Sequence, residues 1–285
     1  MQTTSKLIAG VATIDLRVRD IDETAAFYQD VVGLQVTDRA GARSVLRPPG
    51  GAPLVRLNSE GVVGPADARA TGLFHTAFLF PDRPSLAAAL ARMVAAGVQV
   101  GAGDHGVSEA LYTSDPDGNG IELYRDRPRD EWPRPGPGER VGMYTRPVDL
   151  DGLLADAGEP KSSAPAATII GHVHFQASDI DETVDFYTRG LGLDLMARLG
   201  DSAAFFSSGG YHHHVGANTW RSRGGPHSTR DRAGLDQVTF RVDDATELAH
   251  ARERLNGINR EPGGTGPGLE ITDPDGIDLR FSTDV

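Results

Sequence analysis

One phrase occurs twice in this chain of 285 residues, and its recurrence restricts the fold to a duplicated one. DIDETAAFY runs from Asp20 to Tyr28 and DIDETVDFY from Asp179 to Tyr187, an offset of 159 residues. Two more pairs of matching segments follow in the same order: GLFHTAF (72–78) with GLDQVTF (234–240), and DPDGNGIEL (115–123) with DPDGIDL (273–279). Matches in one order indicate that each half of the chain repeats the same structural plan.

The repeat predicts two tandem domains, at residues 8–127 and 168–285, which agrees with the roughly two domains expected for this length. The segment between them, residues 128–167, begins within RPRDEWPRPGPGE and contains EPKSSAP near its end. Its proline, glycine and charge content is typical of a linker rather than of a core.

Each half reads as two smaller units, and each unit as a strand, a helix and three further strands. Unit one opens with apolar residues alternating over 14–18, which is the pattern of a strand. Asp20 or Asp22 can cap the helix that follows, and Gly33 can end it.

Units two, three and four open near Leu73, Ile170 and Leu235. In unit two we expect a helix at 85–96 and strands at 73–80, 98–101, 109–114 and 120–124. The predicted fold class is therefore α+β, with four βαβββ units in two tandem domains and mixed sheets curled into cups.

Residues that commonly bind metals are concentrated in two of the four units. Unit two carries His75 and Glu122, and unit three carries His172, with His174 on the same face of its strand as an alternative. The corresponding positions of units one and four hold Thr13, Asp15, Gln237 and Asp278.

Two ways of pairing the units remain open from the residues alone. Pairing in chain order would leave His75 and Glu122 in one cup and His172 in another. Pairing unit two with unit three would gather all three around one point, and we favour it because it separates retained from lost ligands. Two imidazoles and one carboxylate with open positions suit non-haem Fe(II) and oxygen chemistry.

Several segments resemble the vicinal oxygen chelate superfamily of glyoxalases, bleomycin-resistance proteins and extradiol dioxygenases, and in particular its catechol 2,3-dioxygenases. The resemblance covers both halves and lies in these segments: GHVH from Gly171, GLFH from Gly72, GDHGVSEALY from Gly103, DPDGNGIELY from Asp115 and GYHHHVGAN from Gly210. It implies that both predicted domains are glyoxalase-like.

The resemblance also implies roles for single residues. The metal ligands would be His75, Glu122 and His172, while His105 and Tyr112 would line the substrate pocket. The acid–base histidine maps best to His214, with His212 as the second choice and His213 facing away, as expected for alternation along a strand.

The implied activity is cleavage of catechol or a substituted catechol by O2 at Fe(II), with Mn(II) as an alternative because it accepts the same hard ligands. A small aromatic diol would then be the partner, and symmetric assembly into a homo-oligomer is a common default. Two other functions fit the same fold: a metal-dependent isomerase or lyase of the glyoxalase kind, and a non-catalytic protein that binds small molecules.

Composition excludes several classes of function. The formal net charge of −12 argues against a nucleic-acid surface, which requires a basic face. The absence of cysteine excludes thiolate metal sites and cysteine catalysis. No apolar run reaches the ~18 residues of a membrane span and the start lacks a signal peptide, so we expect a cytoplasmic protein.

Overall fold

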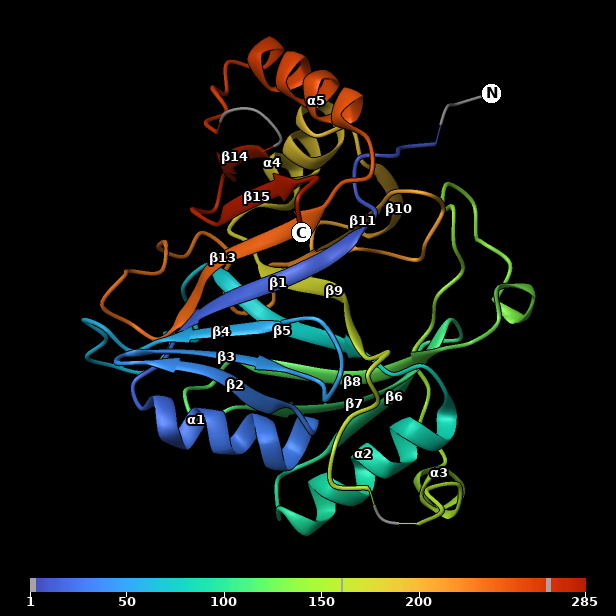
Figure 1. The fold of residues 1–285 in the computed structure, drawn as a ribbon. Helices are drawn as coiled ribbons and strands as arrows, with labels where there is room; N and C mark the ends of the chain where they lie inside the picture. Colours follow the sequence, from blue (N-terminus) through green and yellow to red (C-terminus); the bar gives the residue numbers. More distant parts are fainter. Residues whose placement is uncertain (1–3, 160, 265–267) are drawn as a thin grey trace.

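The opening strands of the four repeat units lie next to one another in one 15-stranded sheet (Figure 1). They are β1 (Gly10–Arg17), β5 (Gly72–Leu79), β9 (Ile169–Gln176) and β13 (Gly234–Arg241). The computed structural model describes residues 4–159, 161–264 and 268–285. In the order β13-β1-β9-β5, β1 pairs with β13 and β5 pairs with β9, both antiparallel.

This pairing confirms the prediction that unit two lies with unit three, and unit one with unit four. We call residues 72–126 with 169–218 the two–three module, and residues 10–58 with 234–282 the one–four module. Pairing in chain order would join β1 with β5 and β9 with β13, and it is excluded because β1 pairs with β13 and β5 with β9. The two modules meet where β1 pairs with β9, at Val11 and Ile170. Each module therefore takes one unit from each half of the sequence.

The remaining strands of each unit extend the sheet outward from its opening strand. They are β2 (Gln35–Ala40), β3 (Arg43–Arg47), β4 (Val55–Asn58), β6 (Gly101–Asp104), β7 (Ser108–Ser114), β8 (Gly120–Asp126), β10 (Asp194–Leu199), β11 (Ala203–Ser207), β12 (Val215–Asn218), β14 (Gly268–Thr272) and β15 (Asp278–Ser282). The strand expected at 98–101 lies at 101–104, because the turn after Gly97 is longer than the sequence suggested. Among the described residues, unit four shows three strands rather than four, and an isolated bridge joins Gly263 to Glu270.

The repeated segments that begin at Asp20 and Asp179 each form the N-terminal cap and first turns of a helix. In α1 (Ile21–Phe27) the Asp20 carboxylate accepts hydrogen bonds from the backbone of the first turn, and in α4 (Ile180–Asp185) Asp179 does the same. Each helix continues into a short π-helical turn, Tyr28–Val32 and Phe186–Gly190. Such an N-cap satisfies backbone N–H groups that would otherwise lack partners.

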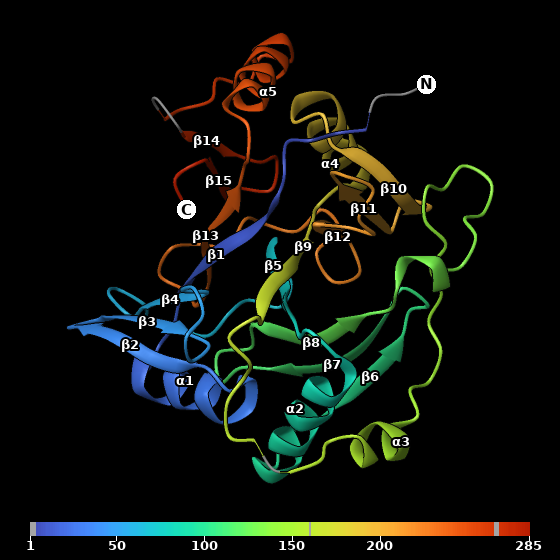
Figure 2. The same ribbon diagram turned by 45° about the vertical axis from the view of Figure 1, so that its right-hand side comes forward.

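The helices of each half pack together even though the strands of the halves are exchanged. Figure 2 shows α1 and α2 (Arg83–Ala95) at one end of the molecule, and α4 and α5 (Ala245–Gly257) at the other. The segment joining the halves holds a 3-10 turn (Arg129–Glu131) and α3 (Leu150–Ala155), which packs on α2. The described residues contain no helix that is both long and apolar enough to span a bilayer.

Candidate metal centre

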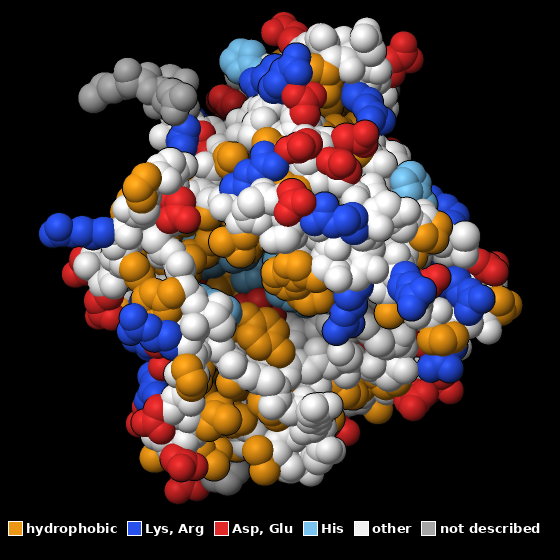
Figure 3. All heavy atoms as spheres, turned by 180° about the vertical axis from the view of Figure 1, so that it is seen from behind, with side chains coloured by type: hydrophobic (Ala, Val, Ile, Leu, Met, Phe, Trp, Pro, Cys, Tyr) orange, Lys and Arg blue, Asp and Glu red, His pale blue; other side chains and the backbone are white. Residues whose placement is uncertain are grey.

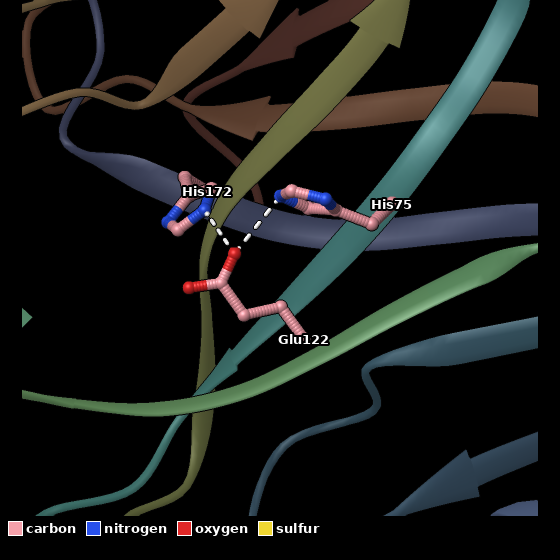
Figure 4. Close-up of side chains that lie close together, drawn as sticks. All are labelled: His75, Glu122 and His172. Atoms are coloured by element: carbon pink, nitrogen blue, oxygen red, sulfur yellow. Dashed lines mark hydrogen bonds and ion pairs between the residues drawn. The ribbon is translucent and has the colours of Figure 1, made fainter. Parts of the chain in front are cut away.

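Two histidine side chains, from two strands, converge on one carboxylate oxygen of a glutamate from a third strand. The Nε2 atom of His75 lies 2.9 Å from Oε2 of Glu122, and Nε2 of His172 lies 3.2 Å from the same oxygen. Both imidazoles point toward the carboxylate in Figure 4. The potential ligand atoms all lie within 4.8 Å of one another, and the three side chains are buried.

Strand register explains why these residues meet. In β5, Ala77 lies opposite Glu122 of β8 on one side and opposite His172 of β9 on the other. The carboxylate and the imidazole thus flank a strand position whose side chain is only a methyl group. His75 precedes Ala77 by two residues and projects from the same face of β5.

The glycine before His172 is required by packing. A Cβ atom at Gly171 would lie 1.8 Å from the hydroxyl oxygen of Tyr124, which is fully buried on β8. No side chain fits in that space. The glycine before His172 therefore leaves room for the Tyr124 side chain of β8, which reaches across β5 to the backbone of β9.

Burial and pairing set the ionisation of the three residues. Burial alone would raise the pKa of Glu122, but the contacts with His172 and His75 outweigh it and hold that pKa well below its usual range. Burial lowers the pKa of His172 to about 4 despite the nearby carboxylate. Near neutral pH the site therefore presents an ionised carboxylate and a neutral His172, which are the protonation states that bind metals.

Two buried nitrogens of the trio, Nε2 of His75 and Nδ1 of His172, lack a hydrogen-bond partner among the described residues. The buried Nε2 of His75 makes no hydrogen bond of acceptable geometry among the described residues, although it lies 2.9 Å from Glu122. An unpaired buried nitrogen is costly unless something else satisfies it. A divalent cation would satisfy it, and a donor set of two nitrogens and one oxygen without sulfur fits Fe(II) or Mn(II).

His105 and Tyr112 lie beside the trio as a hydrogen-bonded pair. The Nε2 atom of His105 is 2.7 Å from the Tyr112 hydroxyl, and its Nδ1 is 3.2 Å from the carbonyl oxygen of Tyr144. Tyr112 on β7 lies opposite Glu122 on β8, and its ring centroid is 5.8 Å from that of His75. Burial, with Glu122 nearby, raises the pKa of Tyr112 well above its usual value, so the phenol stays protonated.

The expected orientation of the histidine run was wrong. Residues 211–214 are not in a strand, because β12 begins at Val215, so their side chains do not alternate. His213, expected to face away, has its ring centroid 4.1 Å from that of His172. His214 instead turns to β11, where its Nδ1 lies 3.0 Å from the Ser207 hydroxyl and accepts a hydrogen bond from the Ser208 backbone N–H.

His174, the alternative to His172, lies beside the trio without joining it. Its ring centroid is 4.9 Å from that of His75, and it packs against Phe74 and Trp220. Among the described residues, the group with metal-binding spacing contains His172 and not His174.

Asp126 was not among the site residues predicted from the sequence, and it contacts the histidine run. Its Oδ1 lies 2.9 Å from Nε2 of His212, and its Oδ2 accepts a hydrogen bond of 2.9 Å from the Tyr211 hydroxyl. Tyr211 in turn lies 2.8 Å from the hydroxyl of Tyr124. A signal was present, because Glu122, Tyr124 and Asp126 alternate along β8 and so share one face.

Six of the nine histidines are buried, and ring contacts connect them into one cluster around the trio. Figure 3 shows a hollow on the face opposite that of Figure 1, rimmed by hydrophobic side chains and with histidine and acidic side chains in its depth. Aromatic rings with polar groups beneath them are typical of a pocket for a small organic ligand.

Comparison with known proteins identifies the class of this fold. The sequence profile of the Glyoxalase/Bleomycin resistance protein/Dioxygenase superfamily matches residues 10–123 and 169–281, so the chain belongs to that superfamily. Over 263 residues it is 43% identical to a catechol-2,3-dioxygenase of Bacillus subtilis (strain 168), with 91% of this chain and 92% of that protein covered.

Solved structures share the fold at low sequence identity. A putative dioxygenase from Bacillus subtilis subsp. subtilis str. 168 superimposes with a TM-score of 0.63 at 13% identity, over 98% of this chain and 86% of that one. Glyoxalase I from Zea mays superimposes with a TM-score of 0.56 at 16% identity, over 96% and 92% of the two chains.

Proposed function

We propose that this protein is an extradiol dioxygenase that cleaves the ring of catechol or a substituted catechol with O2. The convergence of His75, Glu122 and His172 on one buried point is the observation that carries the proposal. It is supported by the 43% identity to a protein named catechol-2,3-dioxygenase, which extends over most of both chains.

In this proposal the three residues hold Fe(II), and Mn(II) is the alternative because the same donors accept it. Such a cation, when bound, lowers the pKa of a catechol hydroxyl and brings the diol and O2 together. Glu122 supplies the negative charge of the ligand set and the imidazoles supply neutral nitrogens. Their burial excludes water from the reacting atoms, which strengthens every electrostatic interaction there.

Tyr112 binds a substrate oxygen, and His105 positions the Tyr112 hydroxyl. The raised pKa of Tyr112 keeps its hydroxyl protonated, so it donates a hydrogen bond to an oxygen that gains negative charge. His105 positions that hydroxyl by donating to it from Nε2 over 2.7 Å, and the Thr145 hydroxyl, 3.2 Å away, donates to Nδ1 on the other side of the imidazole.

We assign the acid–base role to His213 rather than to the expected His214. The Ser208 N–H donates to Nδ1 of His214, so a neutral His214 carries its hydrogen on Nε2 and cannot act as a base there. His213 lies against His172, and burial holds its pKa well below the usual value, so its base form dominates at neutral pH. Its Nε2 would take a proton from a substrate hydroxyl and later return it to the product.

The test is a ring-cleavage assay with simultaneous measurement of oxygen. Protein purified without air and loaded with Fe(II) should convert catechol in air to a yellow ring-opened semialdehyde, with one O2 consumed per catechol. Metal binding without oxygen consumption on a broad panel of catechols would overturn the proposal and favour an isomerase or lyase. Failure to bind any divalent metal would overturn it in favour of a non-catalytic binding protein.

A further inference from the structure

A chain of short hydrogen bonds leads from the C-terminal end of β8 to His213. Asp126 is 2.9 Å from Nε2 of His212, and Nδ1 of His212 is 2.8 Å from Nδ1 of His213. The side chain of His212 is fully buried, whereas that of Asp126 is 26% exposed. The three residues thus connect the surface to the imidazole that touches His172.

The hydrogen positions in this chain follow from the kinds of atom involved. A carboxylate only accepts, so Nε2 of His212 must donate to Asp126. A neutral imidazole carries one hydrogen, which leaves Nδ1 of His212 as an acceptor. The hydrogen between the two Nδ1 atoms therefore belongs to His213, and Nε2 of His213 carries the free electron pair.

We propose that Asp126 is a positioning residue which, acting through His212, fixes His213 as the tautomer with a basic Nε2. This inference rests on the proposed function, in which His213 Nε2 exchanges a proton with the substrate. The logic is that of a catalytic triad, in which a carboxylate orients one imidazole; here a second imidazole lies between them.

The carboxylate of Asp126 is itself held in place. Its second oxygen accepts a hydrogen bond from Tyr211, whose hydroxyl also contacts Tyr124 at 2.8 Å. Among the described residues, the hydrogen bond of the His213 ring is the one at Nδ1, so no other described residue competes to set its protonation. The tautomer of His213 is thus determined from the side away from the pocket.

The tautomer can be read directly from the 15N chemical shifts of the histidine rings in metal-free protein, with His213 assigned by the signal lost in His213→Gln. Wild type should show Nδ1 protonated and Nε2 unprotonated. In Asp126→Asn the side-chain amide can donate to His212, which reverses the chain, and His213 should shift toward the Nε2-protonated form. A wild-type His213 protonated on Nε2 would overturn the inference, whether or not any variant folds.

Kinetic measurements and two matched variants distinguish an effect of Asp126 on the His213 tautomer from a merely structural role. Asp126→Asn should lower kcat roughly 10- to 100-fold, the range for residues behind a ligand or base, with KM for catechol changed less than about threefold. Asp126→Glu should restore the tautomer and part of kcat. Tyr211→Phe removes the other bond to Asp126 and should keep the wild-type tautomer.

An unchanged tautomer in Asp126→Asn, or an equal change in Tyr211→Phe, would overturn the inference. Because the ring nitrogens are read without metal or substrate, this outcome is separate from that of the proposed function. A wild type with the expected tautomer but no ring cleavage would overturn the activity and leave the hydrogen-bond chain intact.

Discussion

The two modules share one architecture and differ in what surrounds their carboxylates. In the two–three module, Glu122 is buried and faces imidazoles. In the one–four module, Asp278 is 30% exposed and pairs with Arg230, while Asp15 pairs with Arg56. The corresponding positions, one module against the other, are His172 with Thr13, His75 with Gln237, and Glu122 with Asp278.

The difference shows how a duplicated scaffold keeps or loses a cation site. An arginine carries a permanent positive charge and neutralises its aspartate at all ordinary pH values. Glu122 has no arginine partner of this kind; it faces His75 and His172, and among the described residues Nε2 of His75 beside it makes no hydrogen bond. The fold alone does not specify a metal site: in the one–four module Thr13 and Gln237 stand where the two–three module has imidazoles, and each aspartate has an arginine partner.

The largest expected effect comes from removing the charge of the two–three carboxylate. Glu122→Gln keeps the shape of the side chain and should abolish stoichiometric iron binding. It should also lower kcat/KM at least about 10³-fold, which corresponds to roughly 4 kcal/mol. Iron content by elemental analysis and ring-cleavage rates provide the measurement.

Asp278→Asn makes the equivalent change in the one–four module and is the control. Its carboxylate contacts an exposed Arg230, so iron content and rate should match wild type. If Glu122→Gln kept its iron, or if the two variants behaved alike, the contrast between the modules would be broken.

A second matched pair tests the close packing of the Tyr124 side chain against Gly171 of β9. Gly171→Ala places a methyl group against the buried Tyr124 hydroxyl and should destabilise the metal-free protein by about 3 kcal/mol, the upper part of the range for overpacking. The corresponding residue of unit one is Ala12, where the reverse change Ala12→Gly should cost about 0.5–1 kcal/mol. Urea denaturation measures both, and equal losses would refute the steric argument.

The buried His214 of the two–three module should make the stability of the protein depend on pH. Burial lowers the pKa of His214 from 6.5 to about 3. Between pH 6.5 and about 3, His214 is therefore protonated in the unfolded chain but not in the folded chain. The free energy of unfolding thus decreases as the pH falls through this range. Between pH 7.5 and 5 one such imidazole costs roughly 2 kcal/mol.

Replacing that imidazole isolates its share from the other titrating groups. Metal-free His214→Asn should lose roughly 2 kcal/mol less than wild type between the same two pH values. The same exchange at His250, exposed on α5, controls for the loss of one histidine. Parallel stability curves for His214→Asn and wild type would show that burial of His214 does not set this dependence.

Much of the site was predictable because it depends on patterns of period two and on repeats. The 159-residue offset exposed the loss of histidines at Thr13 and Asp15, and that distribution predicted the pairing of units two and three. The aspartate caps were predictable because a cap is a local interaction.

The errors lie where local periodicity does not apply. His213 was placed outward because residues 212–214 were taken as strand, whereas the regular pairing begins at Val215. Alternation along β8 showed only that Asp126 shares a face with Glu122; its contact with His212, a residue 86 positions away, could not be predicted from that pattern. Long-range hydrogen bonds are determined by the packed fold rather than by neighbours in sequence.

The smallest expected effect concerns Arg56, which pairs with Asp15 in the one–four module. Burial raises the pKa of Asp15, and Arg56 opposes that shift. Both side chains remain partly exposed, so solvent screens the pair and Arg56→Ala should cost at most about 1 kcal/mol at pH 7. The cost should shrink as pH falls below the raised pKa of Asp15, because the protonated carboxyl no longer needs a cation. Denaturation at pH 7 and pH 3 measures it, and a cost that grew on acidification would show that Arg56 acts through packing instead of charge.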